Sequence, residues 1–377
     1  MSSFNYSEVP ECYPGYNLTV EETLSYLYTP FGKYFIIVVV PIVSAFGLFG
    51  NGSFLYVVYR SSDMRTITNV YLTSLAVADS LLLINGALQY LWSFTHSHGL
   101  NFDGTFTFDS PAGCSLPNML IYLCYFASVF LVTLVTMERY VAICHTLSYR
   151  VSKQRAIAMN IAAWVLSFTM AGFQIPFFDV RTVCVSWPLD DEEYTGLPDK
   201  LPVCFHACEW CVNMTVWVDF IQYILVVPAV IFMSVAMARK LRNSLRRKDS
   251  IRSTKSTQAR TNLVHMIQIN AMIFIVCLTP YEIINLNAIA NIHGSRFLTS
   301  QQGHYITWIG RTTVLLNSAV NPLIYSIVNP VYRKAFYQMY CCIRCEKQQQ
   351  TQEKTVGVAT ASSKYDMVTT NLTANDI

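Results

Sequence analysis

Long apolar segments alternate with short polar segments along most of this chain. An α-helix needs about 20 apolar residues to cross the roughly 30 Å hydrocarbon core of a bilayer. Seven segments reach that length, and they cover residues 34–59, 68–94, 114–138, 157–178, 215–238, 264–291 and 305–328. The pattern therefore predicts seven membrane-spanning helices joined by short loops.

These apolar segments contain polar or proline residues near the middle. Asp79, Asn51 and Asn321 are examples of the polar residues, and Pro280 and Pro322 are examples of the prolines. A polar group in the hydrocarbon layer costs several kcal/mol unless it has a partner. We therefore expect the helices to form one bundle with a polar network inside it, and such a network indicates function.

Composition supports one membrane bundle rather than a set of soluble domains. The 377 residues are 53% hydrophobic and 13% charged, whereas soluble domains carry roughly 25% charge. The net charge of +3 is too small to indicate a nucleic-acid partner. We expect an extracellular tail, a seven-helix bundle, an amphipathic juxtamembrane helix and a disordered cytoplasmic tail, over residues 1–33, 34–328, 329–341 and 342–377, respectively.

Basic residues gather in the loop between the fifth and sixth predicted helices. Residues 239–260 contain nine Lys and Arg against one acidic residue, Asp249, whereas residues 190–193 on the opposite side are all acidic. Cytoplasmic loops are enriched in Lys and Arg. We therefore expect a multi-pass plasma-membrane protein with its N-terminus outside, and the polar start of the chain predicts no cleavable signal peptide.

Candidate modification sites divide between the two sides. Sequons at Asn5 and Asn17 lie in the predicted extracellular tail and fit glycosylation. Cys341 and Cys342 follow the last span on the cytoplasmic side and suit palmitoylation, although they could instead be buried small residues. Disulfides persist outside the cell, where six cysteines are expected, at positions 12, 114, 184, 204, 208 and 211.

Short motifs occur in the spans in a fixed order. They are Gly50-Asn51, Leu75-Ala76-Val77-Ala78-Asp79, Cys114, Glu138-Arg139-Tyr140, Trp164, Pro228, Phe274 with Cys277-Leu278-Thr279-Pro280-Tyr281, and Asn321-Pro322-Leu323-Ile324-Tyr325. Over about residues 34–340 the chain resembles a rhodopsin-like (class A) G-protein-coupled receptor. The resemblance implies an all-α membrane protein: a seven-transmembrane helix bundle with a short amphipathic eighth helix and a β-hairpin in the second extracellular loop.

Four positions depart from the family pattern. Leu278 stands where the family usually has the Trp of a rotamer switch, and Ala236 where it often has a Tyr. Arg260 replaces the acidic residue that often pairs with the Arg of the third helix, so we expect no ionic lock between helices. Thr146 replaces a Pro, although Leu147 keeps the apolar contact with the G protein.

The resemblance assigns G-protein coupling and activation to residues at the cytoplasmic side and at the helix kinks. Arg139 would leave its neighbour Glu138 on activation and pack against the G protein, and prolines would let helices pivot. The alternative is that Arg139 has no signalling role and that its side chain extends to the membrane surface to keep its charge in water. The set is Glu138, Arg139, Tyr140, Leu147, Pro280, Asn321, Pro322 and Tyr325.

A carboxylate at mid-membrane depth, Asp79, is the candidate for an allosteric Na⁺ site. The resemblance places Ser128, Asn317, Ser318 and Asn321 around it, with Asn51 nearby. The alternative is a hydrated structural network without a specific ion. We expect no other cofactor.

The resemblance also predicts that Cys114 is bonded to the second outer loop. Cys204 is the first choice of partner, and Cys184 and Cys208 remain alternatives. The same loop is predicted to form a hairpin from residues 180–186 and 200–205.

The ligand pocket is expected in the outer halves of the spans. Glu282 could pair with a basic ligand side chain and Arg311 with a ligand carbonyl or carboxylate, or the two could satisfy each other. Ile121 replaces the Asp of amine receptors, and Leu315 replaces the Lys of opsins, so neither ligand class fits. The candidate lining is Gln89, Tyr90, Ile121, Tyr122, Tyr125, Tyr281, Glu282, Asn285, Trp308 and Arg311.

We expect a receptor, not an enzyme, for an extracellular and amidated neuropeptide. Tyr122, Tyr281 and Arg311 resemble the pattern of thyrotropin-releasing-hormone and FMRFamide-like receptors. Expected partners are the peptide, a heterotrimeric G protein, membrane lipids, and a receptor kinase and arrestin acting on the Ser- and Thr-rich tail. The alternative is a class A receptor for a lipid or other small molecule. A transporter would show internal repeats, which we do not find.

Overall fold

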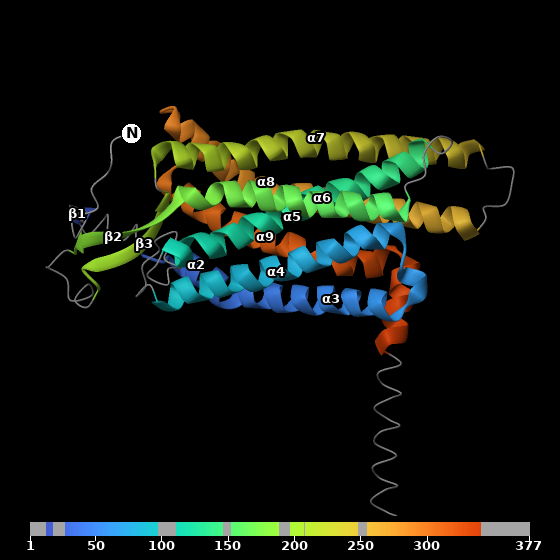
Figure 1. Cartoon of the computed structure of the whole chain (residues 1–377), viewed down its shortest axis with the longest axis horizontal. Helices are drawn as coiled ribbons and strands as arrows, with labels where there is room; N and C mark the ends of the chain where they lie inside the picture. The colour runs from blue at the N-terminus through green and yellow to red at the C-terminus, as the bar shows by residue number, and fades with distance from the viewer. Residues whose placement is uncertain are drawn as a thin grey trace, which may run out of the picture.

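The structure is a computed structural model of the whole chain, and it describes residues 13–17, 27–96, 111–145, 152–187, 197–206, 208–247 and 255–340. Nearly all of this part is helical. The long helices are α3 (Val40–Arg60), α4 (Ile67–His96), α5 (Pro111–Cys144), α6 (Lys153–Gln174), α7 (Glu209–Arg247), α8 (Lys255–Ile292) and α9 (Ser300–Val328). They lie side by side along the longest axis of the molecule (Figure 1).

Short helical segments complete the first span and the connections. The helix α2 (Pro30–Tyr34) and the π-helix η1 (Phe35–Val39) lead directly into α3, so the first span is continuous from Pro30 to Arg60. The 3-10 segment η2 (Ser62–Met64) follows α3, and η3 (Ile175–Phe177) follows α6.

The predicted spans are confirmed as helices. Six helical segments of the described residues are long and apolar enough to cross a membrane, and α9 with the helix after it gives a seventh. Several helices run past their apolar segments: α7 continues beyond residue 238 to Arg247, and α8 begins at Lys255 rather than at residue 264. A helix can extend into water once its apolar part is anchored, because its backbone hydrogen bonds remain satisfied there.

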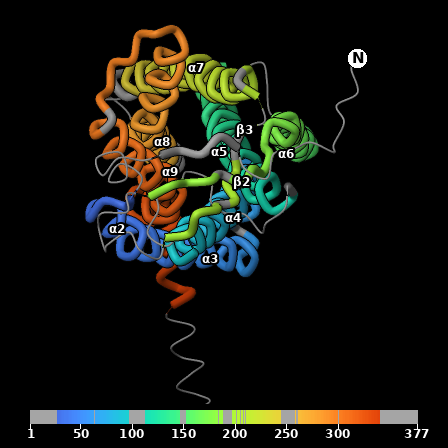
Figure 2. Tube along the Cα trace, turned by 90° about the vertical axis from the view of Figure 1, so that its left-hand side faces the viewer, coloured from blue at the N-terminus to red at the C-terminus, as the bar shows by residue number. Residues whose placement is uncertain are grey.

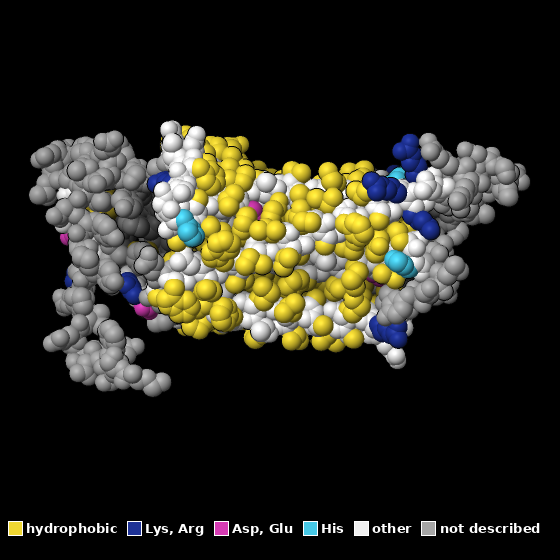
Figure 3. All heavy atoms as spheres, turned by 90° about the horizontal axis from the view of Figure 1, so that it is seen from above, with side chains coloured by type: hydrophobic (Ala, Val, Ile, Leu, Met, Phe, Trp, Pro, Cys, Tyr) yellow, Lys and Arg dark blue, Asp and Glu magenta, His cyan; other side chains and the backbone are white. Residues whose placement is uncertain are grey.

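The helices form a closed bundle. Neighbours in sequence pack together from α3 to α6 and from α7 to α9, α5 also packs against α7, and α9 returns to pack against α3. Figure 2 shows this ring from one end, with α6 at its periphery. Hydrophobic side chains cover the middle of the face in Figure 3, and the visible Lys and Arg lie toward the two ends. This distribution is what a lipid-embedded bundle requires.

Glycine allows the closest helix contact. A Cβ atom built on Gly47 of α3 would lie 2.6 Å from Leu83 Cδ1 and 2.7 Å from the Cβ of Ala319 on α9. Only a residue without a side chain fits there, so Gly47 fixes how near α3 approaches α4 and α9.

A small sheet covers one end of the bundle. The strands β2 (Phe178–Ser186) and β3 (Lys200–His206) are antiparallel, with Val180 opposite Cys204, which confirms the predicted hairpin. A strand from the N-terminal tail, β1 (Tyr13–Asn17), pairs in parallel with β2. Sequence analysis missed this strand because its five residues, which include a proline and a glycine, show no alternation of apolar and polar positions.

Disulfides tie the sheet to the bundle. Cys204 is bonded to Cys114 at the outer end of α5, so the first-choice pairing is confirmed. The alternative partner Cys208 is bonded to Cys211 at the start of α7. Cys184, the other alternative, is also in a disulfide.

The predicted amphipathic helix covers Pro330–Tyr340 and is bent by 100° from α9. Tyr332 is buried while Arg333 and Lys334 are exposed. The Tyr340 hydroxyl lies 3.0 Å from Ser53 Oγ on α3. This helix therefore crosses the end of the bundle rather than continuing the span.

Candidate functional site

The end of the bundle opposite the sheet holds the Glu138–Arg139 pair. Both lie in the last two turns of α5, and the guanidinium donates to both carboxylate oxygens through Nε and Nη2. Thr68 of α4 also donates to Glu138, at 3.4 Å. A bidentate pair of this kind is strong, so Arg139 is held against its own helix.

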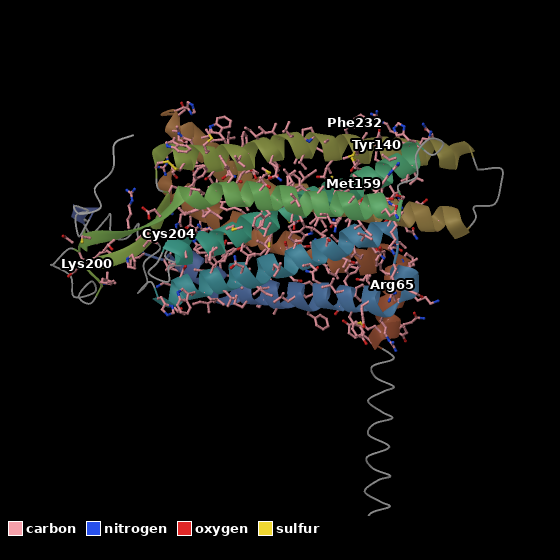
Figure 4. All side chains as sticks on the ribbon, viewed as in Figure 1. Arg65, Tyr140, Met159, Lys200, Cys204 and Phe232 are labelled. Carbon is pink, nitrogen blue, oxygen red and sulfur yellow. A yellow bond between two sulfur atoms is a disulfide. The ribbon has the colours of Figure 1, made fainter. Side chains whose placement is uncertain are left out.

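Aromatic side chains pack around that end. Tyr140 lies 6.1 Å from Phe232 of α7, ring centre to ring centre, and Figure 4 shows both far from Lys200 and Cys204. Tyr325 packs against Phe54 at 5.3 Å.

The Tyr325 hydroxyl is buried without a hydrogen-bond partner among the described residues. A buried polar group without a partner is unfavourable. Tyr325 also packs against Tyr332 at 5.8 Å, and Tyr332 donates to Asn69 of α4.

Asp79 lies at the centre of the bundle and is fully buried. It accepts hydrogen bonds from Ser128 Oγ at 2.9 Å and from Asn321 Nδ2 at 2.7 Å. The structure thus brings together α4, α5 and α9, as the resemblance implied. Asn317 and Ser318 are buried on the same helix as Asn321.

The residues around Asp79 fit a small cation. The Oγ of Ser318 and the Oδ1 of Asn51 are buried with no hydrogen-bond partner among the described residues. Together with the carboxylate and the Ser128 hydroxyl they offer the oxygen ligands that a hard cation prefers.

The expected pocket residues divide into two groups. On the α4–α9 side, the Arg311 guanidinium lies 5.7 Å from the ring centre of Tyr90 and 5.2 Å from that of Trp308. Trp308 is buried. Gln89, also on α4, donates instead to Asn118 of α5 at 3.2 Å.

The second group joins α5 to α8. Tyr125 donates to Glu282 Oε1 at 2.9 Å, and Asn285 donates to Glu282 Oε2 at 3.1 Å. Tyr281 lies 6.1 Å from Tyr125, ring centre to ring centre, and Tyr122 packs against Phe178 of the hairpin at 6.3 Å. Ile121 is half-buried on α5.

The two charged members of the expected pocket do not pair. Within the described ranges the ion pairs are Glu138–Arg139 and Asp179–Arg181. The alternative in which Glu282 and Arg311 satisfy each other is therefore wrong, because Arg311 lies over aromatic rings of α4 and α9 while Glu282 is bound by Tyr125 and Asn285.

Sequence analysis missed an acidic residue of this region. Asp219 of α7 is 1% exposed and interacts with Glu282, Tyr281 and Gln174. Gln174 at the end of α6 and Gln222, one turn after Asp219, are buried too. An acid inside the apolar segment 215–238 was a visible signal, of the same kind that singled out Asp79.

Leu278, which replaces the usual Trp, is buried. It belongs to the main core together with Phe126 and Phe274. Because residue 278 is a leucine, the large aromatic side chain that α8 contributes to this core is Phe274.

Some predicted sites lie outside the part of the chain that the structure describes. They are Leu147, the glycosylation candidate Asn5 and the palmitoylation candidates Cys341 and Cys342. Asn17 is described only as part of β1. Their roles remain predictions.

The fold and the order of its sites are those of a receptor. The chain matches the family model described as "7 transmembrane receptor (rhodopsin family)" over residues 50–325. It therefore belongs to the rhodopsin family of seven-transmembrane receptors, which are multi-pass membrane proteins and not enzymes.

Curated relatives are similar over most of the chain. Neuromedin-U receptor 2 of Mus musculus is 26% identical, covering 89% of this chain and 83% of the relative. Growth hormone secretagogue receptor type 1 of Oryctolagus cuniculus is 25% identical, with 78% and 77% covered. Tachykinin-like peptides receptor 86C of Drosophila melanogaster is 26% identical, with 78% and 56% covered.

Proposed function

We propose that the protein is a plasma-membrane receptor, with its N-terminus outside, that binds an extracellular peptide and activates a heterotrimeric G protein. The observation that carries the proposal is a buried polar cluster around Glu282, which α5 connects to the Glu138–Arg139 pair at the other end of the bundle. A relative named as a receptor for tachykinin-like peptides supports the ligand class.

The pocket suits a peptide because it offers both apolar and polar contacts. Aromatic rings from α4, α5, α8 and α9 surround two separate polar groups, one basic at Arg311 and one acidic at Glu282. The hairpin lies over this end and is held by the Cys114–Cys204 disulfide. A peptide with an amidated C-terminus could place the carbonyl of its terminal amide against Arg311. The guanidinium is a hydrogen-bond donor and can bind a neutral carbonyl as well as a carboxylate.

Signalling is a shift between two packings of the helices. A ligand favours whichever packing it binds better, and the same coupling lets the G protein raise the affinity of the ligand. In the packing seen here Arg139 is bound to Glu138. Activation would separate them, and proline positions inside α7, α8 and α9, at Pro228, Pro280 and Pro322, permit the helices to bend.

The oxygen-rich site at Asp79 would hold Na⁺ with Ser128, Ser318, Asn317 and Asn321. When bound, the ion supplies a positive charge that neutralises the buried carboxylate. The side chains of α4, α5 and α9 are then held together in the present packing. A receptor kinase and arrestin would act on the cytoplasmic tail, and membrane lipids would contact the helix Pro330–Tyr340.

The test is guanine-nucleotide exchange on purified G proteins. The receptor in lipid nanodiscs is exposed to a panel of synthetic peptides, each in amidated and free-acid form, and to lipid extracts. We expect at least one amidated peptide to raise the exchange rate more than its free acid does. Exchange that is raised by lipid extracts and by no peptide would replace the peptide with the lipid or small-molecule alternative.

A further inference from the structure

Three buried polar side chains that the predicted pocket did not include, at the end of α6 and on α7, join a region whose α8 member, Glu282, it did include. Asp219 and Gln222 lie one turn apart on α7, Gln174 ends α6, and Glu282 comes from α8. Asp219 interacts with the Gln174 side chain and, electrostatically, with Glu282. Each of the four is at least nine-tenths buried.

Several atoms of this cluster have no hydrogen-bond partner among the described residues. They are Asp219 Oδ1, Gln174 Oε1 and both amide atoms of Gln222. A buried polar atom without a partner costs about 1–3 kcal/mol. Four such atoms in one region are unfavourable for the receptor by itself, and a bound group with hydrogen-bond donors would satisfy the acceptors among them.

The charges of the cluster point to a cation. Asp219 and Glu282 are both acidic and influence each other electrostatically, and neither takes part in the ion pairs formed within the described ranges. Arg181 of the hairpin lies by Asp179. Two acids that share a buried site without a cation repel each other, so the site favours a ligand that carries positive charge.

We propose that Asp219 and Glu282 form the acidic walls of a subsite that receives a guanidinium group of the ligand. This inference rests on the proposed function and names the side chain that the peptide inserts. A guanidinium has five N–H donors in a plane, whereas an ammonium has three around a point charge. The carboxylates and the Gln174 and Gln222 carbonyls together offer more acceptors than an ammonium can serve.

Aromatic rings complete the subsite. Tyr125 donates a hydrogen bond to Glu282. The ring centres of Tyr125 and Tyr281 are 6.1 Å apart. Tyr281 also interacts with Asp219. A planar guanidinium stacks well on phenol rings, so the walls are acidic and the flat faces are aromatic.

The experiment uses arginine amide and citrulline amide, which have nearly the same shape but differ in charge. Each is added to the purified receptor, and thermal stabilisation is measured as a function of its concentration. We expect arginine amide to stabilise the receptor and citrulline amide to do so at least about tenfold more weakly, because charge-assisted hydrogen bonds are lost. Equal stabilisation by the two, or none by either, would overturn the subsite.

Variants locate the effect. Asp219→Asn and Glu282→Gln should each weaken the arginine amide response about tenfold or more, and the matched control Asp179→Asn, on the hairpin, should not. Gln222→Leu keeps both carboxylates and should weaken the response less, so it tests the site even if Asp219→Asn does not fold. Unchanged responses in Asp219→Asn and Glu282→Gln would contradict the assignment.

The arginine amide test and the nucleotide-exchange test can fail independently of each other. Stabilisation by arginine amide with no peptide that raises nucleotide exchange would support the subsite and contradict peptide activation. Conversely, an Arg-containing peptide that activates wild type and Asp219→Asn equally would support the receptor and overturn the guanidinium subsite.

Discussion

The side-chain amide of Asn321 donates a 2.7 Å hydrogen bond to the carboxylate of Asp79, which joins α9 to α4 at the centre of the bundle. The same carboxylate accepts a bond from Ser128 of α5. One acidic group therefore holds three helices in their present arrangement. Whatever changes the charge or the partners of Asp79 will change the balance between helix packings.

Sodium should favour the inactive packing through this carboxylate. Replacing sodium with choline in the buffer is expected to raise basal nucleotide exchange by the wild-type receptor, because the cation no longer neutralises Asp79. In Asp79→Asn the two buffers should give the same rate. A sodium effect that persists in this variant would leave Asp79 as part of a structural network only.

Arg139 should be needed for signalling but not for ligand binding. We expect Arg139→Ala to abolish agonist-stimulated nucleotide exchange, because the guanidinium that would contact the G protein is removed, and to leave the agonist affinity of the receptor alone within about threefold. Arg65→Ala is the control, since Arg65 is exposed at the same end of the bundle and its guanidinium donates to the carbonyl of Tyr59. Full exchange by Arg139→Ala would refute the assignment.

Gly47 should tolerate no side chain. Gly47→Ala would place a methyl group 2.7 Å from the Cβ of Ala319 and 2.8 Å from its Cα, so α3 or α9 must shift, at a cost of about 1–3 kcal/mol. Gly52→Ala is a matched control on the same helix, because nothing lies within 4 Å of its new Cβ. A thermal-unfolding experiment should show a lower Tm for Gly47→Ala than for Gly52→Ala, and equal values would contradict the close contact.

His206 should make the outer sheet sensitive to acid. Burial lowers the pKa of His206 on β3, and the ring packs 5.0 Å from Phe178. The unfolded chain therefore binds a proton at a pH where the folded sheet does not. This contribution to stability is present above the ordinary pKa of about 6.5 and is lost as the pH falls through the lower folded value.

The check is Tm as a function of pH in wild type and His206→Phe. The substitution keeps an aromatic ring on Phe178 and removes the titrating group, so Tm should decrease less below about pH 6.5. His293→Gln, at the exposed outer end of α8, should retain the wild-type dependence. If His206→Phe also retained it, another group would be responsible.

Much of the architecture could be read from the chain. Apolar length and loop charge are local properties, so residues 34–328 were resolved into seven spans without knowledge of how the helices pack. Pairings that depend on orientation were harder. The Cys114–Cys204 bond and the hairpin agree with the resemblance, whereas the strand β1 and the Cys208–Cys211 bond were not expected.

In the expected pocket, too, residue positions were easier to predict than the partners of each side chain. Sequence analysis named Tyr125, Glu282 and Asn285 among the pocket candidates, and in the structure Tyr125 and Asn285 both donate to Glu282. It allowed Arg311 and Glu282 to pair, and it omitted Asp219. The partner of a buried charge depends on the rotation of each helix about its axis, which a short apolar segment does not encode.

By itself, the sequence determined that seven apolar segments are long enough to cross a membrane and which polar side chains would be costly in lipid. Tertiary structure decided which of those side chains meet: Asp79 with Asn321, Glu282 with Tyr125, and Asp219 with Gln174. The reason is physical. Burial of apolar length is set residue by residue along the chain, whereas a hydrogen bond between helices requires their rotation and separation to be fixed by packing across the whole bundle.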